Sequence, residues 1–115
     1  MRAMLTVSLL FALAAGPAFA DCTAPQDTVQ VPDGATATLD QMVAAQRAVK
    51  AFDTAVKAYG ACLQQEEDAK VTAGGNKDKL NAQYAKLTNK QVDKDTKVAA
   101  KFNDELRAYK AKNTG

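Results

Sequence analysis

Five lysines between residues 86 and 101 have the spacing of a single helix face. Their intervals are four, four, three and four residues, which keeps the side chains within about 40° of one direction along a strip about 22 Å long. The members of this lysine strip are Lys86, Lys90, Lys94, Lys97 and Lys101. Like charges one helical turn apart repel each other unless an acidic group neutralises them. The strip is therefore a candidate site for an anion or an acidic partner.

The neutralising group could lie inside or outside the molecule. Asp93, Asp104 and the acidic first half of the chain are the internal candidates. External candidates are lipopolysaccharide or phospholipid head groups, a teichoic-like polymer and an acidic protein. The ordinary alternative is a solvent-exposed helix face with no ligand.

Catalytic chemistry has few candidates in this chain. Histidine, the usual general base and metal ligand, is absent. The acidic run at 66–68, like Asp93 and Asp95, belongs to an expected helix whose neighbouring side chains diverge by about 100°, so these carboxylates cannot converge on a metal. We expect the run at 66–68 to be solvent-exposed helix surface. Gly74-Gly75 lacks the Lys-Ser/Thr of a phosphate-binding loop. We expect no catalytic residue, no metal site and no cofactor, and predict that the protein is not an enzyme.

The first 20 residues have the layout of a secretory signal peptide. Arg2 supplies a positive start, residues 3–15 are apolar, and residues 18–20 form an A-x-A cleavage site. The apolar run is too short to span a bilayer as a helix of the mature protein. We therefore predict cleavage after Ala20 and a periplasmic or secreted protein. A lipid anchor on Cys22 is disfavoured, because Asp21 stands where a lipobox has a small residue.

Cysteine usage agrees with export. Cys22 and Cys62 are the only two cysteines, and an even number in an oxidising compartment predicts one disulfide. Their separation of 40 residues excludes a CxxC redox motif, and pairing leaves no free thiol for nucleophilic chemistry.

The remaining sequence predicts an extended segment followed by two helices. Residues 21–37 contain proline and glycine and have no helical period, with a turn expected at 32–34. Thr38 and Gln41 fit a capping box, so a first helix is expected over about 38–73, ending at Gly74-Gly75. Asn76 is the expected N-cap of a second helix that ends near residue 112.

Two helices of similar length joined by a short turn pack antiparallel. The expected fold is all-α: a coiled-coil-like two-helix hairpin over 38–115, about 50 Å long, with a disulfide-pinned extended N-terminal segment. The first helix carries a heptad seam, and the second a longer, nearly 11-residue period. The seam positions of the second helix are Leu80, Tyr84, Leu87, Gln91, Asp95, Val98, Phe102, Leu106 and Tyr109. The seam of the first helix is Met42, Ala45, Val49, Phe52, Val56, Tyr59 and Leu63. Gln91 and Asp95 in the second helix predict that the middle of the interface is its weakest part.

A stripe of small residues lies about 100° around the first helix from the heptad seam. Its members are Ala44, Ala48, Ala51, Ala55, Ala58 and Cys62. A disulfide at Cys62 would return the N-terminal segment along this helix, so we expect the segment to cover the alanine stripe with Val29 and Val31. In the alternative, the alanines only reflect helix propensity on an exposed face.

Charge differs between the two halves of the chain. Residues 21–75 carry eight acidic and four basic side chains, whereas residues 76–115 carry five acidic and ten basic ones. The opposite net charges favour packing of one half on the other. Nucleic acid is not an expected partner, because export separates the protein from it and no exposed aromatic residues alternate with the lysines.

Several short sequences resemble a group of small exported proteobacterial proteins of unknown function. They are Cys22 with Pro25, Val31-Pro32-Asp33-Gly34-Ala35, Met42, Val49-Lys50-Ala51-Phe52, Tyr59, Cys62-Leu63, Phe102-Asn103 and Arg107-Ala108-Tyr109-Lys110. The resemblance implies export and a crosslinked hairpin, and it brings no activity. The leading hypothesis is a non-enzymatic binding, adaptor or envelope-associated protein, whose partner is an envelope component or another protein. The alternative is a structural homo-oligomer in which two hairpins form a four-helix bundle.

Overall fold

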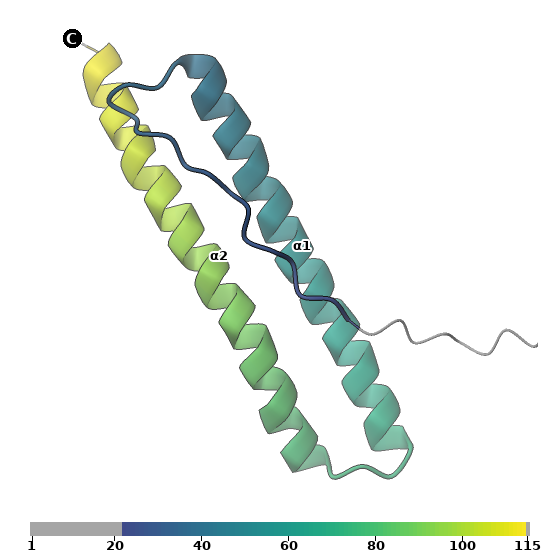
Figure 1. Cartoon of the computed structure of the whole chain (residues 1–115). Helices are drawn as coiled ribbons and strands as arrows, with labels where there is room; N and C mark the ends of the chain where they lie inside the picture. The colour runs from purple at the N-terminus through teal and green to yellow at the C-terminus, as the bar shows by residue number, and fades with distance from the viewer. Residues whose placement is uncertain (1–21, 115) are drawn as a thin grey trace, which may run out of the picture.

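The computed structural model describes residues 22–114, so the predicted signal peptide at 1–20 lies outside the described part of the chain. Helix α1 spans Leu39–Thr72 and helix α2 spans Lys77–Asn113. The two helices pack side by side in opposite directions, and residues 22–114 contain no strand (Figure 1). The expected all-α helical hairpin is confirmed.

Local hydrogen bonds account for where the helices begin. At the start of α1, the Gln41 amide donates to Thr38 Oγ1 at 3.2 Å, and the Thr38 amide donates to Gln41 Oε1 at 2.9 Å. This reciprocal pair is the capping box that the sequence predicts. Asn76 caps α2 by accepting from the Lys79 amide at 3.0 Å. Gly74 adopts φ +98° in the turn between the helices, a conformation that glycine reaches without strain.

The core is a narrow seam divided into three apolar clusters. Met42, Ala45 and Phe102 form one cluster near the start of α1, and Phe52, Val56 and Val98 form the next. Tyr59, Leu63 and Tyr84 form the third, near the turn between the helices. No large side chain within residues 22–114 is completely buried. Two helices alone leave one side of each seam residue open, so a third element has to cover it.

Residues 22–37, which we call the strap, are that third element. Cys22 and Cys62 form a disulfide with a Cα–Cα distance of 5.8 Å, as the sequence predicts. From this crosslink the strap runs between the two helices and crosses α2 near its C-terminal end before it enters α1 (Figure 1). Val29 packs on the Phe52 cluster, and Val31 packs on the Met42 cluster.

The strap lies along the alanine stripe only in part, since its residues 25–32 border Ala44, Ala48, Ala51 and Ala55. Its valines enter the seam between the helices, and only its flank borders the stripe, where Ala48 and Ala55 are half-buried. Ala44, Ala51 and Ala58 remain exposed. The physical reason is area: a valine in the seam buries apolar surface on both helices, whereas the stripe offers only methyl groups of one helix.

The turn at Pro32-Asp33-Gly34 fixes the far end of the strap on α2. The Gly34 amide donates to Glu105 Oε2 at 2.7 Å. A Cβ atom at Gly34 would overlap the carbonyl oxygen of Glu105 and lie 2.9 Å from the Tyr109 amide nitrogen. Only glycine allows the strap backbone to approach the α2 backbone this closely.

Candidate binding surface

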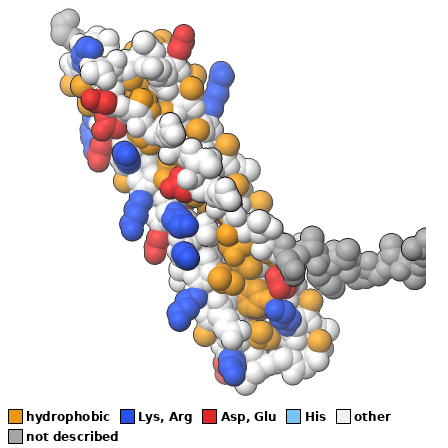
Figure 2. Space-filling view, viewed as in Figure 1, with side chains coloured by type: hydrophobic (Ala, Val, Ile, Leu, Met, Phe, Trp, Pro, Cys, Tyr) orange, Lys and Arg blue, Asp and Glu red, His pale blue; other side chains and the backbone are white. Residues whose placement is uncertain are grey.

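The lysine strip lies on α2 as the spacing predicts. Lys86, Lys90, Lys97 and Lys101 are exposed, and Lys94 is half-buried. Blue side chains follow the α2 edge of the molecule in Figure 2. A regular helix from Lys77 to Asn113 therefore holds the five ammonium groups on one face.

None of the five lysines has an acidic partner within residues 22–114. The ion pairs in this part of the chain join Lys57 to Asp53, Lys70 to Glu66 and Arg107 to Asp104. Asp104, one of the two α2 acids that could have neutralised the strip, is therefore used by Arg107. The internal neutralisation considered from the sequence is not formed here.

The acidic run at 66–68 is not one uniform solvent-exposed surface. Glu67 is buried, with 8% of its surface exposed, beside Asn81 and Tyr84 of α2. Glu66 faces Lys70 at 3.3 Å, and Asp68 accepts from Gln64 at 3.0 Å. The three side chains diverge, and no group of three potential metal ligands occurs among the described residues.

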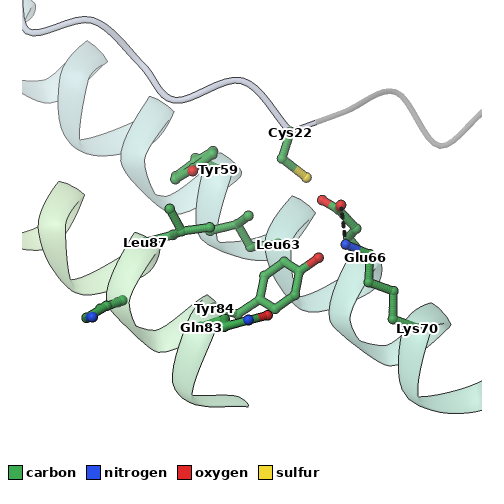
Figure 3. Close-up of a pocket in the computed structure, with 9 residues that line it drawn as sticks. Cys22, Tyr59, Leu63, Glu66, Lys70, Gln83, Tyr84 and Leu87 are labelled. Atoms are coloured by element: carbon green, nitrogen blue, oxygen red, sulfur yellow. Dashed lines mark ion pairs between the residues drawn. The ribbon is translucent and has the colours of Figure 1, made fainter. Parts of the chain in front are cut away.

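An open groove of about 490 Å³ lies beside the disulfide, on the side toward the turn between the helices. We call it the tip groove; it is lined by Cys22, Tyr59, Leu63, Glu66, Lys70, Gln83, Tyr84, Lys86 and Leu87. In Figure 3, Leu87 and Tyr84 of α2 face Leu63 and Tyr59 of α1, with Cys22 above them. On the face shown in Figure 2, the largest group of hydrophobic side chains lies in this region, next to the point where the described strap begins.

Charged side chains occupy the rim of the tip groove. The Lys70 ammonium is 3.3 Å from Glu66 and 5.3 Å from the centre of the Tyr84 ring. The interaction with the Tyr84 side chain, followed by that with Glu66, raises the pKa of Lys70. Lys86 lines the same groove without an acidic partner in residues 22–114, so it belongs to both the tip groove and the lysine strip.

Sequence reasoning missed the tip groove, although one signal for it was present. The crosslink at Cys62 fixes where the strap meets α1, so the strap cannot cover the seam beyond that residue. Leu63, Tyr84 and Leu87 were expected only as seam residues. Their open side becomes evident once the strap is placed: Leu87 is 45% exposed.

A polar layer interrupts the seam between the Phe52 and Tyr59 clusters. Gln91 is 5% exposed, and its Oε1 atom has no hydrogen-bond partner among residues 22–114. Asp95 Oδ1 is also buried without a partner in this part of the chain. Burial raises the pKa of Asp95, and its interaction with the neighbouring Asp53 carboxylate adds to the rise. Asp53 has a lowered pKa because Lys57 donates to it at 2.8 Å and Asp95 interacts with it. The expectation of a weak middle of the interface agrees with these unpartnered atoms.

Replacing Asp95 by Asn is expected to raise the free energy of unfolding by about 1 kcal/mol at pH 7, because it removes a negative charge that is shielded from water and lies beside the Asp53 carboxylate. An amide stays neutral and can donate to the Asp53 carboxylate. Because the folded pKa of Asp95 lies above the ordinary value of an aspartate, Asp95 favours folding when protonated and loses that contribution as pH rises through its folded pKa. The gain from the substitution should therefore shrink as pH falls through the folded pKa of Asp95.

Urea denaturation at a series of pH values measures this gain. Asp93→Asn is the matched control, because it removes the same charge from an exposed position of α2 and should change stability by less than about 0.5 kcal/mol. An Asp95→Asn effect equal to that of the control at every pH would show that the Asp95 carboxylate is not desolvated.

Comparisons with other proteins do not assign this fold to a family. No known protein family, curated protein or solved structure matches the chain. In the described part of the chain, neither helix is both long and apolar enough to cross a membrane. The lysine strip and the tip groove are therefore the surfaces from which a function can be inferred.

Proposed function

We propose that this protein is an exported, non-enzymatic hairpin that binds an anionic component of the cell envelope through its lysine strip. The observation that carries the proposal is the absence of any acidic partner for the five lysines within residues 22–114. Unneutralised lysines one turn apart cost a few tenths of a kcal/mol per pair. A bound anion would remove that cost and add its own attraction.

Export is supported by two independent features. The first 20 residues have the layout of a signal peptide, and the Cys22–Cys62 crosslink suits an oxidising compartment. We therefore place the protein in the periplasm or outside the cell, where anionic lipids and polymers are the abundant polyanions.

Co-sedimentation of the mature protein with vesicles containing anionic lipid, and separately with peptidoglycan sacculi, tests this function at low and high salt. Each lysine near an anionic surface contributes about 1 kcal/mol. Changing Lys90, Lys94 and Lys97 to Gln should therefore weaken binding about a hundredfold at low salt, and high salt should weaken binding of the native protein as well.

The matched control changes three exposed lysines of α2 that lie outside the strip, namely Lys77, Lys110 and Lys112. Both variants have the same net charge, so a difference in binding between them can come only from the position of the replaced lysines. Equal losses of binding in the two variants would show that binding depends on overall charge and not on the lysine strip. No binding to vesicles or sacculi at either salt concentration would overturn the proposal.

The second candidate function is a structural homodimer that forms a four-helix bundle. It is favoured by the thin core, which contains no completely buried large side chain in the described residues, and by Leu39 and Val92, which are 61% and 45% exposed. The mass of the mature protein in solution at micromolar concentration separates the two candidates. An obligate dimer favours the bundle, and a monomer favours the binding protein.

A further inference from the structure

The seam between α1 and α2 is covered along part of its length and open along the rest. Val29 and Val31 of the strap fill it beside the Phe52 and Met42 clusters. Beyond Cys22 the same seam continues as the tip groove, whose floor is made by Tyr59, Leu63, Tyr84 and Leu87. The open part thus continues a surface that already binds an extended chain within this molecule.

The covered part shows what kind of chain the seam accepts. Between the strap and the helices, the described residues form one hydrogen bond besides the capping contacts at Thr38, from the Gly34 amide to Glu105. Apolar side chains of the strap make the other packing contacts, because the backbone groups inside a helix already bond to each other. These side chains are Cys22, Val29, Val31 and Ala37. The seam therefore recognises aliphatic groups and offers little to a peptide backbone. An alkyl chain satisfies it as well as a peptide does, without polar groups to desolvate.

The size of the groove suits a chain of medium length. Its volume of about 490 Å³ lies within the roughly 300–1,000 Å³ that small-molecule pockets have. From Tyr59 to Lys70, α1 rises about 16 Å. An extended laurate chain, at roughly 1.3 Å per carbon–carbon bond, is about 14 Å long.

The charged side chains at the rim of the tip groove determine which head group a bound hydrocarbon chain can carry. Lys86 has no acidic partner in residues 22–114, whereas Glu66 is paired with Lys70. A neighbouring groove of about 330 Å³ shares Lys70 and Gln83 with the tip groove and adds Lys79. Lys86, Lys70 and the Glu66 carboxylate that pairs with Lys70 therefore line the groove around its apolar floor, and Lys79 lies in the neighbouring groove. This arrangement complements an anion at the end of a hydrocarbon chain.

We propose that the tip groove binds a free fatty acid, with its alkyl chain between Leu63 and Leu87 and its carboxylate at Lys86. This site names a ligand class for the proposed envelope-binding function, and it rests on that function because Lys86 belongs to both the lysine strip and the tip groove. With the predicted cleavage after Ala20, Asp21 alone precedes Cys22 in the mature chain. The mature strap is then too short to cover the groove itself.

Isothermal titration calorimetry of the oxidised mature protein with laurate, below the concentration at which laurate forms micelles, tests the site. Saturable binding of one laurate per chain is expected, at least fivefold tighter than binding of the cationic chain dodecyltrimethylammonium. Leu87→Asp should weaken laurate binding at least tenfold, and Lys86→Gln about threefold to fivefold. Leu87 is 45% exposed, so this substitution should leave the fold intact.

Val92→Asp is the matched control, because Val92 is also 45% exposed on α2 and does not line the groove. It should bind laurate as the native protein does. Absence of saturable binding, or equal affinities of the Leu87→Asp and Val92→Asp variants, would overturn the proposal. A preference for the cationic chain would overturn it too.

The two proposals fail in different ways. The variant with Lys90, Lys94 and Lys97 changed to Gln keeps Lys86 and the groove, and it should retain laurate binding while losing vesicle binding. Laurate binding without any binding to vesicles or sacculi would remove only the proposed function. Vesicle binding through the strip without laurate binding would remove only the fatty-acid site.

Discussion

Replacing both Cys22 and Cys62 by Ser is expected to lower the free energy of unfolding by about 4 kcal/mol. The crosslink joins residues 40 positions apart, and closing a loop of that length restricts the unfolded chain by about this amount in the chain-entropy model. The folded state loses something as well, because Cys22 packs on the Tyr59 cluster. A loss of this size is a large part of the total stability of a small domain. It should therefore exceed the change in the free energy of unfolding expected for the other substitutions.

Urea denaturation followed by far-ultraviolet circular dichroism measures the loss. The native protein, reduced and alkylated, should match the double Ser variant, whereas the oxidised protein should show no free thiol when titrated under denaturing, non-reducing conditions. Two free thiols, or a stability change below about 1 kcal/mol, would contradict a crosslinked strap. Thermolysin gives an independent readout, because release of the strap from the seam should make Val29 and Val31 accessible to cleavage.

Local sequence signals predicted the helices well because their causes are local. Thr38 and Gln41 lie three residues apart and form the capping box in the structure, and Gly74 supplies the left-handed turn residue. The disulfide was equally predictable, since two cysteines allow only one pairing. These features depend on residue type and spacing, and no knowledge of the partner helix is needed.

Features that depend on both helices at once were not predictable in the same way. The strap was expected on the alanine stripe because that stripe can be seen on α1 alone, whereas Val29 and Val31 contact a seam made jointly with α2. Glu67 is buried for the same reason, beside Asn81 and Tyr84 of the opposite helix. The tip groove requires three elements, since it is bounded by both helices and by the end of the strap.

Gly34→Ala is expected to lower the free energy of unfolding by about 2–3 kcal/mol, through steric overlap in a closely packed contact. The new methyl group would overlap the carbonyl oxygen of Glu105 and lie 2.9 Å from the Tyr109 amide nitrogen, both of which belong to the α2 backbone and cannot swing aside. Gly34 has no positive φ, so the cost comes from the contact and not from the conformation of the residue. The turn should move off α2 and lose its 2.7 Å hydrogen bond to Glu105 Oε2.

Gly60→Ala is a control with the opposite sign. Gly60 lies inside α1, and a methyl group there meets nothing closer than Thr88 Cγ2 at 4.0 Å. Alanine in a helix interior should therefore stabilise the protein by about 0.5–1 kcal/mol. Equal effects of the two substitutions in urea denaturation would show that the turn does not rest on α2 in solution. If the turn does rest there, removing the Glu105 carboxylate from the native protein should lower its stability. The same change in the Gly34→Ala variant should have almost no effect, because that variant has already lost the hydrogen bond between residue 34 and Glu105.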